Sequence, residues 1–362
     1  IVESETPSRG VRIAAVLTSI ALAWITYRLI EKPVRFGGRG KAKSCALLAL
    51  MVVVGYVGYN CYERDGLGFR LKGRQDYSEY FENSLPEQRY FKKLGIIEKY
   101  RFECDFYDHL NYRIGHSTNI PIREIGRNCF ERNRDYRNAV LIWGDSHAAQ
   151  LHFGLKNNLP SSWQILQVAT SGCSPSVNVS EPSSTNYCDQ SNWFALKTIS
   201  EIKPNVVIVS QNLDHSTVSF GQIAEKLKSF GIEKIIFTGP TPHWTTDLPK
   251  IILTKLWLNT PRRTYAGIDQ KVLKENKALQ EAFKQTETEK FVNLIDFFCN
   301  QDGCLTRIGD DKKAGITTWD YGHLTPIASD YLAKELLVKW VIGNTGVSLD
   351  SANPPSGASL RR

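Results

Sequence analysis

A short apolar run that ends in a glycine-containing turn decides what fold this chain is expected to adopt. Residues 139–151 read Ala-Val-Leu-Ile-Trp-Gly-Asp-Ser-His-Ala-Ala-Gln-Leu. The run Ala139–Trp143 predicts a buried parallel strand, and the apolar spacing after the turn predicts a helix. Gly144 permits a sharp turn between them at little steric cost. We therefore expect Ser146 at the carboxyl edge of an α/β sheet, where such folds bind ligands.

A second motif, far downstream, supplies the partners that a serine nucleophile needs. A serine hydroxyl is a weak nucleophile and requires a nearby base that a third group orients. Asp320 and His323 are three positions apart, just before a predicted helix that Thr325 can cap. Taken alone, the first motif is equally well explained by Asp145 or Ser146 capping a helix. Together, the two motifs predict a catalytic triad of Ser146, His323 and Asp320.

Both motifs resemble signatures of the SGNH hydrolase family, in which the first block carries the nucleophile and the last carries the acid and base. Thr170–Cys173, after a predicted strand, resembles the glycine block of that family. Ser210–Asn212, after another predicted strand, resembles its asparagine block. The resemblance implies an oxyanion hole formed by the backbone N–H groups of Ser146 and Gly172 and the side chain of Asn212.

Predicted strands and helices alternate through the rest of this domain. The expected strands are 139–143, 163–168, 205–209, 234–237 and 291–295, and the expected later helices are 194–202, 223–230, 268–288 and 327–341. This alternation predicts an α/β fold with a parallel sheet and helices on both faces. With the resemblance, the expected fold is SGNH-hydrolase-like, which is a flavodoxin-like arrangement. Asp320 and His323 are expected to follow the last strand at the same edge of the sheet as Ser146.

Cysteine usage indicates an oxidising compartment. Of the eight cysteines, two lie in an apolar N-terminal segment and six fall into local pairs: Cys104 with Cys129, Cys173 with Cys188, and Cys299 with Cys304. An even set at short spacings predicts disulfides, although the pairing rests on proximity alone. Zinc is the competing interpretation, but Cys-x-x-Cys and His-x-x-x-His spacings are absent, so no metal site is expected.

Two long apolar segments, Val11–Ile30 and Ser44–Tyr62, predict a membrane hairpin, because each suits a span of about 20 residues. A pair of buried core helices is the alternative. The connection between the segments is basic, with Arg35, Arg39, Lys41 and Lys43. Because positive loops stay in the cytoplasm, the chain after Tyr62 is expected outside it.

The stretch Tyr27–Arg35, reading Tyr-Arg-Leu-Ile-Glu-Lys-Pro-Val-Arg, resembles the end of the last core membrane helix of the acyltransferase-3 family. Some members, bacterial O-antigen O-acetyltransferases among them, carry an extra helix and an SGNH domain on the same chain. The chain begins at Ile1, and we expect it to be the C-terminal portion of such a protein. The resemblance implies the bacterial inner membrane as its location, with the SGNH domain in the periplasm.

The same resemblance implies the partners. They are membrane lipid, an N-terminal acyltransferase-3 domain of the same chain and a cell-surface polysaccharide acceptor. Acetyl-CoA is the expected acyl donor through that membrane domain, and no cofactor is expected in this portion. Nucleic acid is not expected as a partner: residues 1–43 hold eight Lys/Arg and three Glu, a net of +5, which leaves only +3 of the total +8 for the rest.

Four regions are expected: the membrane hairpin over 1–62, a periplasmic linker or extension over 63–137, the SGNH domain over 138–342 and a disordered tail over 343–362. The second region is charged and rich in Tyr and Phe, and its hydrophobic periodicity is weak. The sequence fits equally a linker packed against the SGNH domain and a plain spacer.

The predicted function is transfer of an acetyl group to a sugar hydroxyl of a bacterial cell-surface glycan, the O-antigen of lipopolysaccharide. The alternatives are a carbohydrate esterase or deacetylase with the same triad, and a non-catalytic glycan-binding module. His147 is expected to point away from the serine, and His215 and His243 are expected as solvated loop residues. Four tryptophans are candidates for lining a sugar site, but core positions are the stronger expectation for them: Trp143, Trp193, Trp244 and Trp319.

Overall fold

The computed structural model describes residues 9–37, 40–63, 89–113, 115–179, 186–256, 260–312 and 314–343. The chain divides into two compact units, residues 1–78 and residues 79–362. The predicted tail lies outside the described residues except for Gly343, as do residues 64–88 of the predicted linker.

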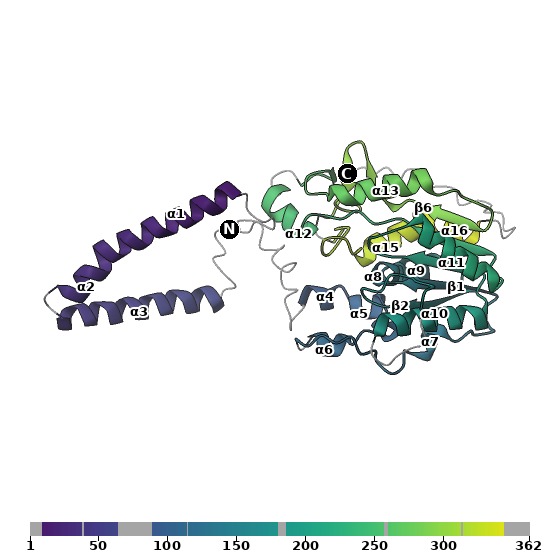
Figure 1. Ribbon diagram of the computed structural model, residues 1–362, viewed down its shortest axis with the longest axis horizontal. Coiled ribbons are helices and arrows are strands. Elements are labelled where there is room, and N and C mark those ends of the chain that lie inside the picture. The colour runs from purple at the N-terminus through teal and green to yellow at the C-terminus, as the bar shows by residue number, and fades with distance from the viewer. Residues whose placement is uncertain are drawn as a thin grey trace, which may run out of the picture. The chain divides into compact units, whose positions relative to one another are not determined.

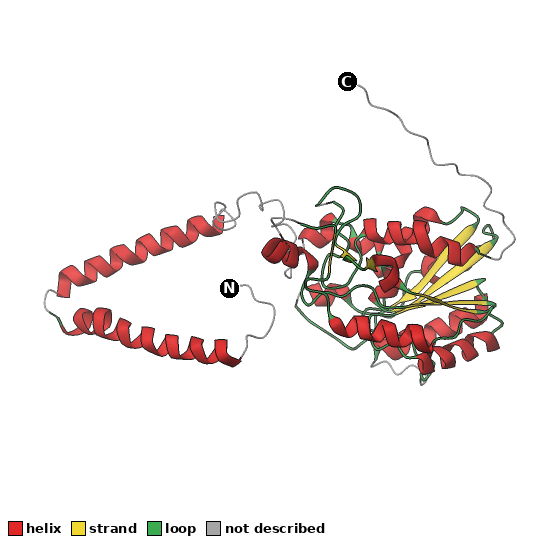
Figure 2. Cartoon of the chain, turned by 90° about the horizontal axis from the view of Figure 1, so that it is seen from above, coloured by secondary structure: helices red, strands yellow, loops and turns green. Residues whose placement is uncertain are grey.

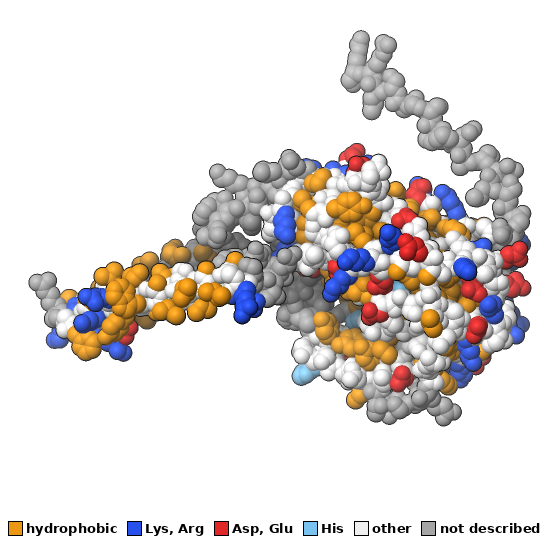
Figure 3. Space-filling view, turned by 45° about the horizontal axis from the view of Figure 1, so that its top comes forward, with side chains coloured by type: hydrophobic (Ala, Val, Ile, Leu, Met, Phe, Trp, Pro, Cys, Tyr) orange, Lys and Arg blue, Asp and Glu red, His pale blue; other side chains and the backbone are white. Residues whose placement is uncertain are grey.

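The first unit contains two long helices. One runs through α1 (Arg9–Thr26), a π-helical turn η1 (Tyr27–Glu31) and α2 (Lys32–Phe36), and the other is α3 (Gly40–Glu63). By length and composition both can cross a membrane, with mean hydropathies of 1.8 and 1.7, and none of their described side chains is buried. Figure 3 shows hydrophobic side chains along both helices and basic ones where α2 and α3 meet.

The π-helical turn has a local cause in the sequence. Pro33 lacks an N–H and its ring clashes with the carbonyl group four residues earlier, so a regular α-helical turn is disfavoured there. The N–H of Lys32 instead reaches back five residues to the carbonyl oxygen of Tyr27. The acyltransferase-3-like stretch therefore coincides with a local irregularity of the helix.

The second unit is built on a five-stranded parallel sheet in the order β2-β1-β3-β4-β6. This is the flavodoxin-like order, with β6 as the fifth strand of the sheet. Its strands are β1 (Asn138–Gly144), β2 (Trp163–Ala169), β3 (Val206–Ser210), β4 (Lys234–Thr238) and β6 (Glu289–Val292). In register, Gly144 lies beside Ala169 on one side and Ser210 on the other, so three loops leave the carboxyl edge side by side.

Helices cover both faces of this sheet, as predicted (Figures 1 and 2). Alternate residues of β1 to β4, such as Leu141 and Phe237, form a core with α10 (Tyr187–Ile202), α11 (Thr217–Ser229) and α13 (Gln270–Ala282). The intervening residues face the other side. There lie α9 (Leu151–Asn158), α15 (Pro326–Leu332), the π-helical η6 (Ala333–Leu337) and α16 (Val338–Ile342).

Several element bounds differ from the sequence prediction: α10 and α11 begin earlier than expected, and α13 ends at Ala282. The predicted strand 291–295 is wrong at its end, because Asn293 accepts the N–H of Asp296 and begins the helix α14 (Leu294–Phe298). A three-stranded antiparallel sheet was not predicted, since its strands hold two or three residues each: β5 (Arg263–Thr264), β8 (Gly303–Leu305) and β7 (Cys299–Asn300). Short helical turns α12 (Leu248–Ile251) and η5 (Ile252–Leu256) precede it.

The segment before β1 packs into the second unit. It contains the short helices α4 (Arg89–Lys93), α5 (Ile96–Lys99), η4 (Phe102–Cys104), α6 (His109–Arg113) and α7 (Arg127–Phe130). Phe106 and Ile125 join the core on the α10 side of the sheet, together with Cys104 and Cys129. The three predicted disulfides are present: Cys104–Cys129, Cys173–Cys188 and Cys299–Cys304. The described part of this segment is therefore no plain spacer.

Candidate active site

The turn after β1 places Ser146 at the carboxyl edge of the sheet. Gly144 ends the strand with φ 153°, and a Cβ at this position would lie 1.8 Å from the carbonyl oxygen of Ser210. Only glycine fits such an approach. Ser146 then begins the short helix α8 (Ser146–Ala149), which Asp145 caps by accepting the N–H of His147 at 2.8 Å. Capping by Asp145 and presentation of the serine are thus features of one turn.

The structure brings the three predicted triad side chains together. Ser146 Oγ lies 2.7 Å from His323 Nε2, and His323 Nδ1 lies 2.6 Å from Asp320 Oδ2. The other carboxylate oxygen of Asp320 accepts the N–H groups of Gly322 at 2.9 Å and His323 at 2.7 Å. The side chains of His323 and Asp320 keep 12% and 15% of their surface exposed, so a reactant can reach them. This geometry lets the imidazole take a proton from the serine while the carboxylate fixes its tautomer.

Charge pairing sets the protonation of the acid and base. Burial disfavours the charged form of His323, but the charge and hydrogen bond of Asp320 outweigh it and raise the pKa of His323 above its ordinary value. Burial likewise opposes ionisation of Asp320, yet His323 and two backbone N–H groups lower the pKa of that carboxyl. The pair therefore stabilises the imidazolium that forms when the serine loses its proton.

The acid–base loop, residues 319–324, comes after the last strand of the main sheet as expected, but 28 positions separate Asp320 from Val292 at the end of β6, so the strand itself does not place it. Long-range hydrogen bonds hold it instead. Gln150 Oε1, one turn beyond the serine, accepts the N–H of Leu324 at 2.7 Å. The N–H of Trp244 donates to the carbonyl oxygen of Tyr321 at 2.7 Å. The hydroxyl of Thr241 donates to the carbonyl oxygen of Gly322 at 2.9 Å. Thr325 caps α15 as predicted, through the N–H of Ala328.

An aromatic pair supports the imidazole: Trp319, in the acid–base loop itself, and Tyr100, from the segment before β1. The Trp319 ring stacks on that of His323, with centroids 5.3 Å apart and an interplanar angle of 19°. Trp319 Nε1 donates to the hydroxyl of Tyr100 at 3.2 Å, and this hydroxyl donates to the carbonyl oxygen of Leu324 at 2.6 Å. Our sequence prediction missed Tyr100, because nothing in its local pattern connects it with a loop more than 200 positions later.

The predicted oxyanion-hole residues leave the same edge of the sheet. Gly172 follows β2 with φ 74°, and its N–H has no hydrogen-bond partner within the part of the chain that the structure describes. Asn212 follows β3, where its backbone N–H donates to Asp145 Oδ2 at 2.8 Å. Its side-chain amide donates to the hydroxyl of Tyr321 at 2.9 Å. Since an amide has two N–H donors, one remains for a substrate oxygen.

Two further histidines are buried beside the triad. The rings of His147 and His323 are 4.3 Å apart, and those of His147 and His243 are 5.3 Å apart. Burial lowers the pKa of His147 well below its ordinary value and that of His243 to about 4, so both stay neutral. The expectation that His243 and His215 are solvated loop residues was wrong. His243 is 2% exposed, and His215, whose side chain is enclosed, lies 2.6 Å from Glu275.

Asp145 is the remaining ionisable group near the serine. Burial raises its pKa to about 6, against the N–H groups of Asn212 and His147, which lower it. Because its two oxygens accept one N–H from each loop, the carboxylate joins the serine turn to the asparagine loop. Of the tryptophans, Trp143 and Trp244 are in the core as predicted, whereas Trp193 is only half-buried and Trp319 lies against the triad.

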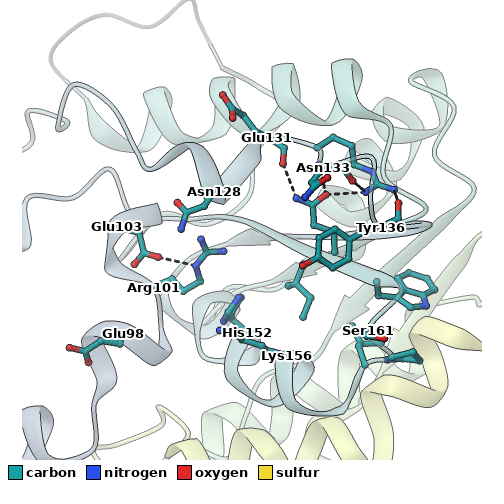
Figure 4. A pocket seen from close by; sticks show the side chains of 16 residues that line it. Glu98, Arg101, Glu103, Asn128, Glu131, Asn133, Tyr136, His152, Lys156 and Ser161 are labelled. Atoms are coloured by element: carbon teal, nitrogen blue, oxygen red, sulfur yellow. Dashed lines mark hydrogen bonds and ion pairs between the residues drawn. The ribbon is translucent and has the colours of Figure 1, made fainter.

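A separate cavity of about 940 Å³ lies beside the amino-terminal end of β2. Figure 4 shows Arg101 and Glu103 paired within it, with His152 close by. Burial and the charge of Arg101 lower the pKa of His152 to about 3. None of the described residues that line this cavity belongs to the triad. The hydrogen bonds, and not cavity size, therefore locate the reactive centre.

Comparison with known proteins places this site in a family. Residues 114–337 match the family described as the SGNH domain (fused to AT3 domains). This match covers more than half of the chain, so the chain belongs to that family. The periplasmic domain of a lipopolysaccharide acetyltransferase from Salmonella ser. Paratyphi A has a similar fold, with a TM-score of 0.55 at 22% identity over 70% of this chain and 95% of that one. A comparison with curated proteins finds no match.

Proposed function

We propose that this protein transfers an acetyl group to a hydroxyl of a bacterial cell-surface glycan, the O-antigen of lipopolysaccharide. The observation that carries this proposal is the chain of short hydrogen bonds from Ser146 through His323 to Asp320. These three residues lie in a domain of a family that is fused to acyltransferase-3 domains. The fold shared with the periplasmic domain of a lipopolysaccharide acetyltransferase supports the choice of acceptor.

The reaction proceeds in two halves. Ser146 Oγ attacks the acyl carbonyl carbon while His323 Nε2 takes the hydroxyl proton, and the tetrahedral oxyanion is held by the N–H groups of Ser146 and Gly172 and by the Asn212 amide. Collapse breaks the bond to the leaving group, which receives that proton, and leaves acetyl-Ser146. His323 Nε2 then takes the proton of the sugar hydroxyl as the sugar oxygen attacks the acetyl carbon. Collapse of this second intermediate breaks the bond between the acetyl carbon and Ser146 Oγ, which takes the proton back from His323, and the sugar ester departs.

The two apolar helices and the oxidised cysteines support a location. Both helices can cross a membrane by length and composition, and three disulfides form in the second unit. Disulfides persist in oxidising compartments such as the bacterial periplasm. We place the hairpin in the inner membrane and the SGNH domain in the periplasm. An acyltransferase-3 domain of the same protein would deliver the acetyl group of acetyl-CoA, and no cofactor is needed at the triad.

The test compares glycan acetylation in cells that carry the full-length protein or its Ser146→Ala variant. Ser219→Ala, an exposed serine on α11, is the matched control. We expect the Ser146 variant to lose acetylation and the control to keep it. A rise in acetylation in the Ser146 variant would instead identify a deacetylase. Normal acetylation by a folded, exported Ser146 variant would overturn the proposal and favour a glycan-binding module.

A further inference from the structure

Asp105 lies upstream of the matched family region yet reaches the loop that carries Gly172. Its side chain is almost completely buried, as the residue is 3% exposed. Oδ2 accepts both the backbone N–H of Ser171 at 3.1 Å and its hydroxyl at 2.7 Å, and it lies 2.6 Å from His109 Nε2. Oδ1 accepts the N–H of Tyr107 at 2.8 Å. Both oxygens of the carboxylate are thus hydrogen-bonded, and two of these four contacts go to Ser171, the residue before Gly172.

Asp105, His109 and Ser171 have the composition of a catalytic triad but not its geometry. In a triad, the acid orients one imidazole nitrogen while the other nitrogen faces the serine. Here the same nitrogen of His109 faces both Asp105 and the Ser171 hydroxyl, the latter at 3.3 Å. The serine hydroxyl donates to the carboxylate itself. This cluster therefore cannot activate Ser171, and its effect is to fix the position of the loop.

The fixed loop is the one that follows β2. The N–H of Phe106 donates to Thr170 Oγ1 at 3.1 Å, so two consecutive loop residues are tied to the upstream segment. We call the contacts of Asp105 and Phe106 with this loop the clamp. Cys104 adjoins Asp105 and forms a disulfide with Cys129, which anchors the clamp in the core. The Phe102 ring stacks on that of His109 at 3.9 Å. The next residue after Ser171 is Gly172, whose N–H is free to donate within the described part of the chain.

We propose that Asp105 is a positioning residue for the oxyanion hole: it holds Ser171 so that the N–H of Gly172 points at the developing oxyanion. This inference rests on the proposed function and assigns to the upstream segment a role in the chemistry. Loss of an oxyanion-hole donor typically costs ~10²–10³ in rate, and displacing one without removing it should cost less. We therefore expect a fall in kcat of about 10-fold to 100-fold when the clamp is broken.

The test uses the full chain purified in detergent, with a chromogenic acetyl ester as substrate. Asp105→Asn leaves one acceptor oxygen, and Ser171→Ala removes the hydroxyl donor, whereas Ser171→Thr restores it. Asp108→Asn is the matched control, because the contacts of Asp108 stay within the first turn of α6. The rate of covalent labelling of Ser146 by a fluorophosphonate, which also needs the oxyanion hole, provides a second readout.

We expect Asp105→Asn and Ser171→Ala to lower kcat and the labelling rate with little change in KM. Ser171→Thr should recover most of the rate, and Asp108→Asn should resemble the wild type. The acid limb of the pH–rate profile should not move, since His323 keeps its partners. Equal rates for Ser171→Ala, Ser171→Thr and wild type would overturn the inference. So would a loss in Asp105→Asn that matches its loss of folded protein. Full activity of Ser146→Ala would instead refute the proposed function itself.

Discussion

The serine turn and the acid–base loop reach the same point by different routes. Ser146 stands two residues after the last residue of β1, and its position follows from the strand and one glycine. Asp320 comes 28 positions after Val292, the end of β6, and its loop depends on contacts from Gln150, Thr241 and Trp244. Local backbone geometry therefore sets the position of the serine, whereas long-range packing sets that of the acid and base. Substitutions should break these two halves of the site in different ways.

Gly144→Ala should have the largest effect, because it attacks the fold at the serine turn. The new methyl group would meet the carbonyl oxygen of Ser210 at 1.8 Å, on a backbone with φ 153° that other residues rarely adopt. We expect a destabilisation above about 4 kcal/mol, in the range reserved for severe strain and overpacking. Expression level and the unfolding midpoint followed by tryptophan fluorescence measure it. Gly221→Ala, on α11 with open space around it, is the control. A stable Gly144→Ala protein would show that the turn is not locally determined.

Ser146→Ala and His323→Ala should abolish ester turnover without unfolding the protein. The two side chains share one proton, so removing either removes the same step. The double variant should be little worse than either single variant, because groups that act as a unit are strongly non-additive. Turnover of a chromogenic acetyl ester, compared among the four proteins, checks this. Additive losses would mean that the serine turn and the acid–base loop act independently.

Asp320→Asn separates geometry from charge within the acid–base loop. Asp320 raises the pKa of His323, and the base works only when neutral, so activity should fall as pH drops through a pKa above the ordinary value of about 6.5. The variant should lose roughly 10³–10⁴ in kcat, and its acid limb should move to lower pH. The pH–rate profiles of wild type and variant test the sign. An acid limb that moves upward or stays in place would contradict the pairing.

These two halves also explain how far sequence reasoning could go. The alternation of strands and helices, the serine turn and the meeting of Ser146, His323 and Asp320 could be predicted, because short motifs and local spacing carry them, while the flavodoxin-like class came from the family resemblance. The residues that hold the acid–base loop could not be predicted, since Gln150 and Tyr100 contact that loop only after the chain has folded. The burial of His243 was missed for the same reason: a residue in a loop after a strand looks solvated until other loops cover it. The role of Asp105 could not be predicted either, because no recognisable motif surrounds it in the sequence.

Tyr100→Phe should have the smallest effect and tests the long-range half most directly. Removing the hydroxyl leaves the carbonyl group of Leu324 and the indole N–H of Trp319 without their partner, at a cost of about 1–3 kcal/mol. Because Trp319 stacks on His323, the imidazole loses part of its support, and we expect kcat to fall about 3-fold to 10-fold.

The control is Tyr112→Phe, at a residue that is 43% exposed and lies in the same upstream segment. Turnover and the unfolding midpoint are measured for both variants. If Tyr100→Phe loses stability and rate while Tyr112→Phe loses neither, packing from outside the sheet holds the base. If Tyr100→Phe keeps both, the hydrogen bonds of Gln150, Thr241 and Trp244 suffice to hold the acid–base loop. The contribution of the upstream segment would then be confined to the Gly172 loop.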